Sequence, residues 1–177
     1  MGETVNAIRD LSGLYFKVKR HVFDAEKYTL KASPRIHVAF RDALDDLMTY
    51  VTSGSEKPSE IRRHLWRAAY AAWTDASALQ IAKLEKRLSS FTVSGPTDEA
   101  NRLLDLARKE MADARDYFSS DPEKAVESVK NSAIDATNAL SMLQESSRFF
   151  KISVFLTAIG ILLALISLLI SLTKLSK

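Results

Sequence analysis

Apolar residues recur at every third or fourth position through most of this chain, which is the spacing of one face of an α-helix. No stretch alternates polar and apolar residues for long enough to predict a β-strand. The pattern stops at short segments rich in Pro, Gly and Ser, which are typical of turns. It predicts five helices, at about residues 3–31, 34–52, 58–92, 97–119 and 122–173. We therefore expect an all-α protein built around a helical bundle.

Three of these predicted helices each have an apolar face that we expect to be buried. In the first helix this face consists of Val5, Ile8, Leu11, Tyr15, Val18, Val22 and Ala25. In the second helix it consists of Ile36, Phe40, Ala43, Leu44, Leu47 and Val51. In the fourth helix it consists of Leu103, Leu104, Ala107, Met111, Ala114 and Phe118.

The third predicted helix differs because it has two adjacent apolar stripes. One stripe consists of Leu65, Ala69, Ala72, Ala76 and Leu79. The other consists of Trp66, Tyr70, Trp73, Ser77, Leu84, Leu88 and Phe91. Two stripes indicate contacts on more than one side, so we expect this helix at the centre of the bundle. Its small alanine side chains would let neighbouring helices approach closely.

The longest apolar stretch of the chain, Ile152–Leu172, contains no charge, no proline and no amide side chain. A helix of this length spans about 30 Å, which is the thickness of the hydrocarbon core of a bilayer. The flanking residues are basic or aromatic, as is typical of residues that anchor a helix at the two membrane surfaces. These interface anchors are Arg148, Phe149, Phe150, Lys151 and Lys174. The sequence therefore predicts a transmembrane helix.

No proline or glycine interrupts the chain between Pro122 and Gly160. This absence predicts that one helix continues from the bundle into the membrane, and a hinge at residues 145–147 is the alternative. We expect residues 1–147 to form a helical bundle, and residues 148–177 to form a single-pass anchor with a short polar tail. Residues 1–20 include six charged residues and have no apolar run of the kind found in signal peptides. The expected topology is tail-anchored, with the bundle in the cytosol.

Small and hydroxylated residues recur along one face of the predicted span with alternating spacings of four and three. This association seam consists of Ser153, Thr157, Gly160, Ala164, Ser167 and Ser171. Small residues let membrane helices approach closely, and hydroxyl groups can form hydrogen bonds between them. The seam therefore predicts that the span associates with other spans, as a homo-oligomer, with the left-handed crossing that a 3.5-residue period favours.

One heptad phase of this seam continues upstream of the span, through Ala136, Leu143 and Phe150. We expect helix association to continue into coiled-coil packing outside the bilayer. Three interpretations of the seam remain open. The hydroxyl groups hold a few helices together, or they line a water-filled pore in a larger ring, or they bond their own backbone in a plain anchor.

Composition gives little support to catalysis. The chain has a formal charge of +3 and no cysteine. All four charged residues after residue 147 are basic, so residues 1–147 carry a formal charge of −1, and we expect no nucleic-acid partner. The three histidines, His21, His37 and His64, lie on different predicted helices, and no pair has the spacing of metal ligands. No motif for phosphate binding or nucleophilic catalysis occurs. We expect no enzyme, no cofactor and no metal.

Two basic clusters lie on the first and third predicted helices. They consist of Lys17, Lys19 and Arg20, and of Arg62, Arg63 and Arg67. If both clusters faced the membrane, they would form a patch for anionic lipid or for an anionic ligand. Acidic residues nearby, such as Asp24 and Glu60, favour the alternative of an ordinary solvated surface.

These observations predict a single-pass membrane protein that self-associates through its transmembrane helix. The cytosolic bundle would respond to a protein partner or a signal and control a membrane assembly, of which a pore is one form. The alternative function is a tether or adaptor, in which the bundle binds a partner protein and the span is only an anchor. The expected partners are membrane lipid, further copies of the chain and a protein that binds the bundle.

Overall fold

The computed structural model describes residues 2–30, 33–54, 57–90 and 96–175; within these ranges, the side chains of residues 2, 3, 96 and 164–175 lie outside the description. Within these ranges the chain forms five helices: α1 (Gly2–Thr29), α2 (Pro34–Ser53), α3 (Pro58–Ser89), α4 (Pro96–Tyr117) and α5 (Pro122–Leu175). No strand occurs among the described residues. The all-α prediction is confirmed, and the predicted helix ends differ from the observed ones by three residues or fewer.

Local signals explain where these helices begin and end. A proline opens four of them, because its fixed φ and missing N–H suit the first turn of a helix. The Ser33 hydroxyl accepts a hydrogen bond from the Arg35 N–H at the start of α2, and Gly54 ends α2 with a left-handed φ of 67°. At the start of α5, the Asp121 carboxylate accepts a hydrogen bond from the Lys124 N–H at 3.0 Å.

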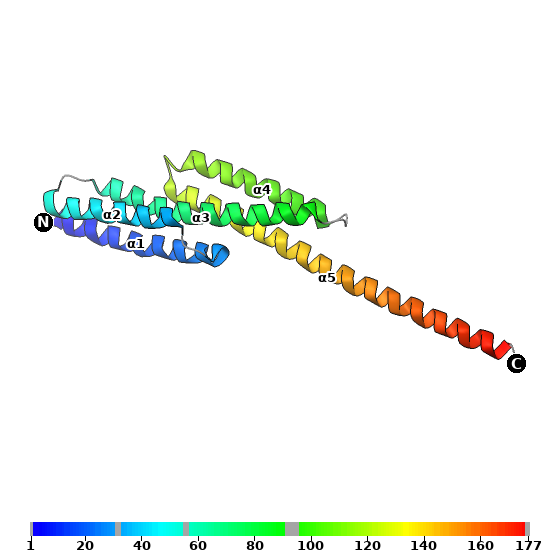
Figure 1. The fold of residues 1–177 in the computed structure, drawn as a ribbon. Coiled ribbons are helices and arrows are strands. Elements are labelled where there is room, and N and C mark those ends of the chain that lie inside the picture. The colour runs from blue at the N-terminus through cyan, green and yellow to red at the C-terminus, as the bar shows by residue number, and fades with distance from the viewer. Residues whose placement is uncertain (1, 31–32, 55–56, 91–95, 176–177) are drawn as a thin grey trace.

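α3 packs against each of the other four helices, as its two apolar stripes predict (Figure 1). α4 and α5 also pack against each other, whereas α1 and α2 each lie on α3 and make little contact with one another. We call α1–α4 together with residues 122–147 of α5 the helical body. α3 and α5 run in the same direction through it, and the remainder of α5 projects beyond it (Figure 1).

The buried apolar side chains form two clusters along α3. The first lies where α1 and α2 cover the first half of α3 and the beginning of α5 joins them. Its largest fully buried side chains are Trp73 and Ile61 of α3. The second lies between the end of α3, α4 and the middle of α5, and it includes Leu84 and Leu143. Alanines supply many of the contacts in both clusters, which lets the helices pack closely.

A buried polar contact separates these two apolar clusters. Ser77 of α3 and Ser132 of α5 are both fully buried, and their Oγ atoms are 2.6 Å apart. The Ser132 hydroxyl also donates a hydrogen bond to the Ala107 carbonyl oxygen of α4 at 2.6 Å. We call these contacts the serine junction. It ties α3, α4 and α5 together at one level and satisfies both buried hydroxyl groups.

Several side chains predicted to be buried are instead exposed. Tyr15 and Ile8 of α1 are more than one-third exposed, and Val5 of α1 and Leu44 and Val51 of α2 are more than half exposed. The α4–α5 turn contacts α3 at Tyr70, whose ring centroid lies 4.6 Å from that of Phe118, whereas Ile8, Tyr15 and Leu44 line a groove over earlier turns of α3, at Ile61 and Leu65. Beyond this level, three helices meet and the inner sides of α1 and α2 stay uncovered.

Candidate functional site

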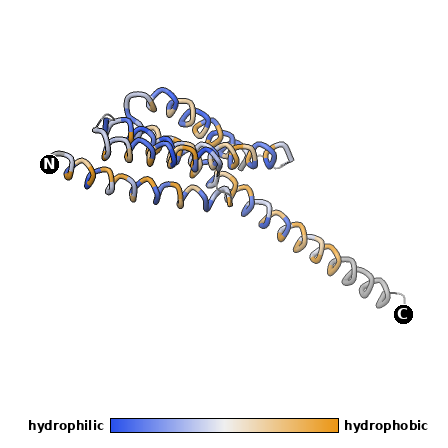
Figure 2. The backbone as a smooth tube through the Cα atoms, turned by 60° about the vertical axis from the view of Figure 1, so that its left-hand side comes forward, coloured by the Kyte–Doolittle hydropathy of each residue, from blue (hydrophilic) through white to orange (hydrophobic). Residues whose placement is uncertain are grey.

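The projecting part of α5 is an apolar surface that no other part of the described chain covers. From Arg148 to Leu163 every side chain is exposed, including Phe149, which is 73% exposed. Most residues of this segment are apolar, as the orange colour of Figure 2 shows. α5 is long and apolar enough to cross a membrane, and it remains one helix through residues 145–147. A mostly apolar helix with exposed side chains on all sides is typical of a membrane span.

The association seam lies on this uncovered segment. Ser153, Thr157 and Gly160 are exposed, and helix geometry puts them on one side of α5. Ala164, Ser167 and Ser171 also lie within the helical backbone of α5, but their side chains are outside the described residues. Nothing lies within 4 Å of the place where a Cβ atom would be added at Gly160, so this face is open in a single chain.

One hydroxyl group of the seam is used within the chain. The Thr157 hydroxyl donates a hydrogen bond to the Ser153 carbonyl oxygen at 2.9 Å, one helical turn back. Such a bond satisfies the hydroxyl without a neighbouring helix, as the plain-anchor interpretation requires. The Thr157 Oγ1 atom retains lone pairs that can accept a hydrogen bond from another chain.

The upstream continuation of the seam has a different role from the one that the heptad phase predicts. Ala136 and Leu143 are fully buried in the second apolar cluster, against α3 and α4 of the same chain. This side of α5 is therefore occupied within the helical body and is not free for another copy. Phe150, the next position of this heptad phase after Leu143, is 54% exposed and is open to contact from another copy.

The interface anchors lie where the projecting segment begins. Arg148, Phe149, Phe150 and Lys151 are exposed on consecutive positions of α5. Two aromatic rings and two cations at this place match the composition of a membrane interface. The side chain of Lys174, the predicted anchor at the other end, lies outside the described residues.

The six residues of the basic patch lie on α1 and α3, and some of them pair with acidic side chains. Lys17 of α1 faces α5, where its ammonium pairs with the Glu123 carboxylate. Arg62 of α3 lies 3.5 Å from the Asp10 carboxylate of α1. These contacts use two of the six cations for ion pairs between helices.

The remaining four cations of the predicted patch are divided between α1 and α3. Arg63 pairs with Glu60, one turn back on α3. Lys19 and Arg20 are exposed on α1, and Arg67 is exposed on α3. These last three form no ion pair with any side chain that the structure describes.

The histidines lie on three separate helices. His21 of α1 lies 3.9 Å from the Glu127 carboxylate of α5, and burial lowers the pKa of His21 below its ordinary value. His64 of α3 lies 3.4 Å from the Asp46 carboxylate of α2. Within the part of the chain that the structure describes, no three His, Cys, Asp or Glu side chains are placed to hold a metal ion.

A second cluster of titratable groups, which the sequence analysis missed, lies between α4 and α5. Burial, together with the negative charges of Asp135 and Asp113, raises the pKa of Glu110 to about 7. One carboxylate oxygen of Glu110 is buried and has no hydrogen-bond partner among the described residues. Burial also raises the pKa of Asp135. The carboxyl group of Glu110 is therefore protonated more readily than an ordinary glutamate.

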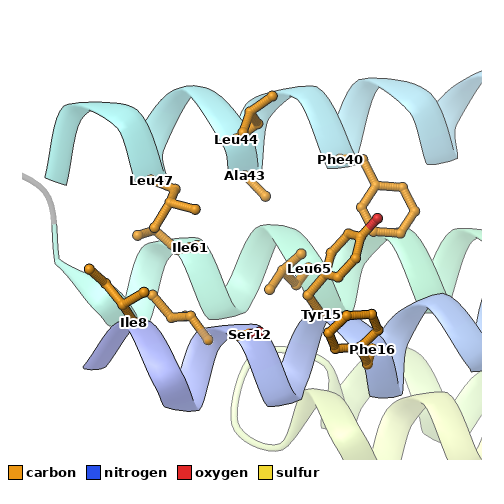
Figure 3. A pocket seen from close by; sticks show the side chains of 11 residues that line it. Ile8, Ser12, Tyr15, Phe16, Phe40, Ala43, Leu44, Leu47, Ile61 and Leu65 are labelled. Atoms are coloured by element: carbon orange, nitrogen blue, oxygen red, sulfur yellow. The ribbon is translucent and has the colours of Figure 1, made fainter. Parts of the chain in front are cut away.

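The structure also contains an apolar groove between α1 and α2, with α3 as its floor (Figure 3). Its volume is about 540 Å³. The walls include Ile8 and Phe16 of α1 and Leu44 of α2, and the floor is formed by Ile61 and Leu65. Most of these residues belong to the apolar faces that the sequence pattern predicts to be buried. The signal for an exposed apolar surface was the width of the apolar face of α1, which includes Phe16 beside Ile8 and Tyr15.

Comparisons of the chain with protein-family models, with curated proteins and with solved structures found no match.

Proposed function

We propose that this chain is a single-pass membrane protein that self-associates through its transmembrane helix. In this proposal, the helical body (residues 1–147) is a cytosolic bundle that binds a protein partner, and residues 148–177 are the tail anchor. Partner binding would control a membrane assembly. With enough copies in a ring, the hydroxylated seam would line a water-filled path, which is the pore form of the proposal.

The observation that carries this proposal is the continuity of α5. The helix runs from Pro122 to Leu175. Its first half is packed against α3 and α4, and the side chains of residues 148–163 that follow are exposed and mostly apolar. A continuous helix links the orientation of the helical body to that of the span, because bending an α-helix sharply breaks backbone hydrogen bonds.

Disulfide crosslinking tests self-association, since the chain contains no cysteine of its own. Ser153→Cys places a thiol on the seam, and Phe155→Cys places one on the opposite side of α5, two residues on. In lipid nanodiscs or native membranes, we expect oxidation to give dimers of the Ser153→Cys protein and few dimers of the Phe155→Cys protein. Equal crosslinking of both variants would show random collision and would refute the seam.

A second experiment tests whether small residues are needed. Gly160→Leu combined with Ala164→Leu should reduce crosslinking at Ser153→Cys by about tenfold, because the larger side chains prevent close approach of the helices. Gly160 has open space around it in the single chain, so the substitution disturbs no contact within the protein. Ile159→Leu is the matched control, since it changes an apolar residue outside the seam. Unchanged crosslinking in the double variant would remove the seam from the mechanism.

The second candidate is a tether or adaptor, in which the span is only an anchor. The hydrogen bond from Thr157 to the Ser153 carbonyl favours this candidate, because it satisfies a seam hydroxyl without a neighbour. Replacing Ile152–Leu172 with a polyleucine helix of equal length separates the two candidates. Under either candidate, the polyleucine variant should still attach to the membrane. Crosslinking between chains next to the span would be lost only if the natural span drives their association.

A further inference from the structure

We propose that the groove between α1 and α2 binds one amphipathic α-helix of a partner protein, with acidic residues beside its apolar stripe. This inference rests on the proposed function, since it identifies the class of partner that the helical body would bind. The groove lies at the end of the helical body farthest from the projecting part of α5 (Figures 1 and 3).

The shape of the groove fits a helix. α1 and α2 both pack on α3 but scarcely touch each other, so they form two walls with Ile61 and Leu65 between them. The rings of Tyr15 on α1 and Phe40 on α2 pack edge to face with 5.8 Å between their centroids, and this contact joins the two walls. From Ile8 to Phe16 the α1 wall is about 12 Å long, which corresponds to an occupant of about two helical turns.

The walls are strongly apolar and remain open to solvent. Phe16 is 64% exposed and Leu44 is 57% exposed, and both line the groove. Next to them on the same helices, Val5, Met48 and Val51 are each more than half exposed. Contiguous exposed apolar side chains of this kind mark interaction surfaces, because burial of the apolar area on binding is favourable.

The charges beside the groove select an acidic occupant. Lys19 and Arg20 of α1 each lie one helical turn after Phe16, and Arg41 of α2 lies one turn before Leu44. Lys19 and Arg20 form no ion pair with any described side chain. Among the described residues, Arg41 pairs with the adjacent Asp42, at 3.4 Å. A second copy docked in the same groove would bring these cations together, which disfavours self-docking.

Distance from the proposed membrane excludes a lipid surface as the occupant. Ser77 of α3 and Ser132 of α5 lie at one level, and the two helices run in the same direction. Ile61 lies 16 residues before Ser77, and Ile152 lies 20 residues after Ser132. At 1.5 Å per residue, the groove is about 50 Å from the start of the span. A headgroup layer at Ile152 does not reach it, so the occupant is a protein.

Binding of two synthetic peptides to the full-length protein in nanodiscs tests the proposal. Both are 14-residue helices with the same leucine stripe, and the residues beside the stripe are glutamates in one peptide and lysines in the other. By fluorescence anisotropy, we expect the glutamate peptide to bind at least ten times more tightly. Equal affinity of the two peptides, or no binding of either, would overturn the proposal.

Variants locate the binding site. Leu44→Ser and Phe16→Ser should each weaken binding of the glutamate peptide about tenfold, and Leu106→Ser, at a partly exposed leucine of α4, is the matched control. Lys19→Glu together with Arg20→Glu should reverse the preference between the peptides. These side chains are exposed, so the circular dichroism of each variant should equal that of the natural protein. If the Leu44→Ser protein binds the glutamate peptide with unchanged affinity, the groove is not the binding site.

Two further outcomes would assign a different occupant and overturn the proposal. If Leu44→Ser dissociates oligomers of the full-length protein, the groove holds a second copy. If anionic vesicles displace the bound glutamate peptide, the groove holds lipid. Crosslinking through Ser153→Cys is measured separately from peptide binding. If the protein does not self-associate but still binds the glutamate peptide, the proposed function of the span is refuted and the proposal for the groove stands.

Discussion

The serine junction offers the sharpest test of how the helical body is held together. The Ser132 hydroxyl has one proton, and it donates this proton to the Ala107 carbonyl oxygen. Ser132 must therefore accept the hydrogen bond from Ser77, whose hydroxyl lies 2.6 Å away. The only other partner of the Ser77 hydroxyl within the described structure is the Met111 sulfur at 3.8 Å, a weak acceptor. The two serines are thus unequal, although they look alike in the sequence.

This inequality predicts different costs for the two alanine substitutions. Ser132→Ala breaks two hydrogen bonds and leaves the buried Ser77 hydroxyl with only a sulfur partner, so it should lower the free energy of unfolding by about 2–3 kcal/mol. Ser77→Ala breaks one hydrogen bond, while Ser132 keeps its carbonyl acceptor, so the expected loss is about 1 kcal/mol. The double variant leaves no hydroxyl unpaired and should lose about 2 kcal/mol, which is less than the sum of the single losses.

Urea unfolding followed by tryptophan fluorescence measures these losses. Trp66 and Trp73 both lie buried on α3, so their emission reports on the helical body and not on the span. The full-length protein in mild detergent is the sample, and Ser141→Ala, at an exposed serine of α5, is the control. Equal losses for the two single variants, or losses that simply add in the double variant, would refute the assigned direction of the hydrogen bonds.

Two further substitutions test the contacts of α5. Because burial and the charges of Asp135 and Asp113 raise the pKa of Glu110 to about 7, the fold favours the protonated form, and this contribution to stability falls as the pH rises from the ordinary pKa through 7. Glu110→Gln should therefore raise the free energy of unfolding at pH 8 by about 1 kcal/mol, after allowance for solvent screening, and should change it little at pH 4. Urea unfolding midpoints at the two pH values measure this difference. An equal gain in stability at both pH values would contradict the proposed cause. Leu143→Ala removes a fully buried side chain of the second apolar cluster and should cost about 2–4 kcal/mol, against less than about 1 kcal/mol for Leu106→Ala at a partly exposed site. Similar urea midpoints for the two leucine variants would show that the α5 contact is weak.

The helices themselves were predictable because their signals are local. Pro34, Pro58 and Pro122 each begin a helix where the pattern of apolar residues restarts. Gly54 ends one in a left-handed conformation that glycine adopts easily. Such signals depend on residues within a few positions of each other, so the chain order alone reveals them.

What covers each apolar face was not predictable, because that depends on distant parts of the chain. Tyr15 and Leu44 occupy positions that repeat with the period of a buried stripe, yet both are exposed. The reason is the length of α4 and the level of the α4–α5 turn on α3, which no local pattern encodes. The groove arises where the apolar stripes extend beyond the helices that would cover them.

The heptad phase of α5 shows the same ambiguity in another form. Ala136 and Leu143 share this phase with Thr157, and the spacing alone assigns all three to one interface between chains. The first two pack inside the helical body, whereas Thr157 lies on the uncovered segment. Small residues allow close helix packing whether the neighbouring helix belongs to the same chain or to another. Only the position of α3 and α4 separates the two uses.

The arrangement of α3 and α5 bears on how a partner in the groove would influence the span. α3 supplies the groove floor through Ile61 and Leu65, and sixteen residues after Ile61 it meets α5 at the serine junction. The shortest physical route from groove to span therefore passes along two parallel helices and contains no loop. Coupling along this route requires the α3–α5 contact to stay intact. Ser132→Ala should leave the affinity of the groove for the glutamate peptide unchanged and weaken any effect of that peptide on crosslinking at Ser153→Cys. If the peptide acts on crosslinking equally in both proteins, the signal travels by another route.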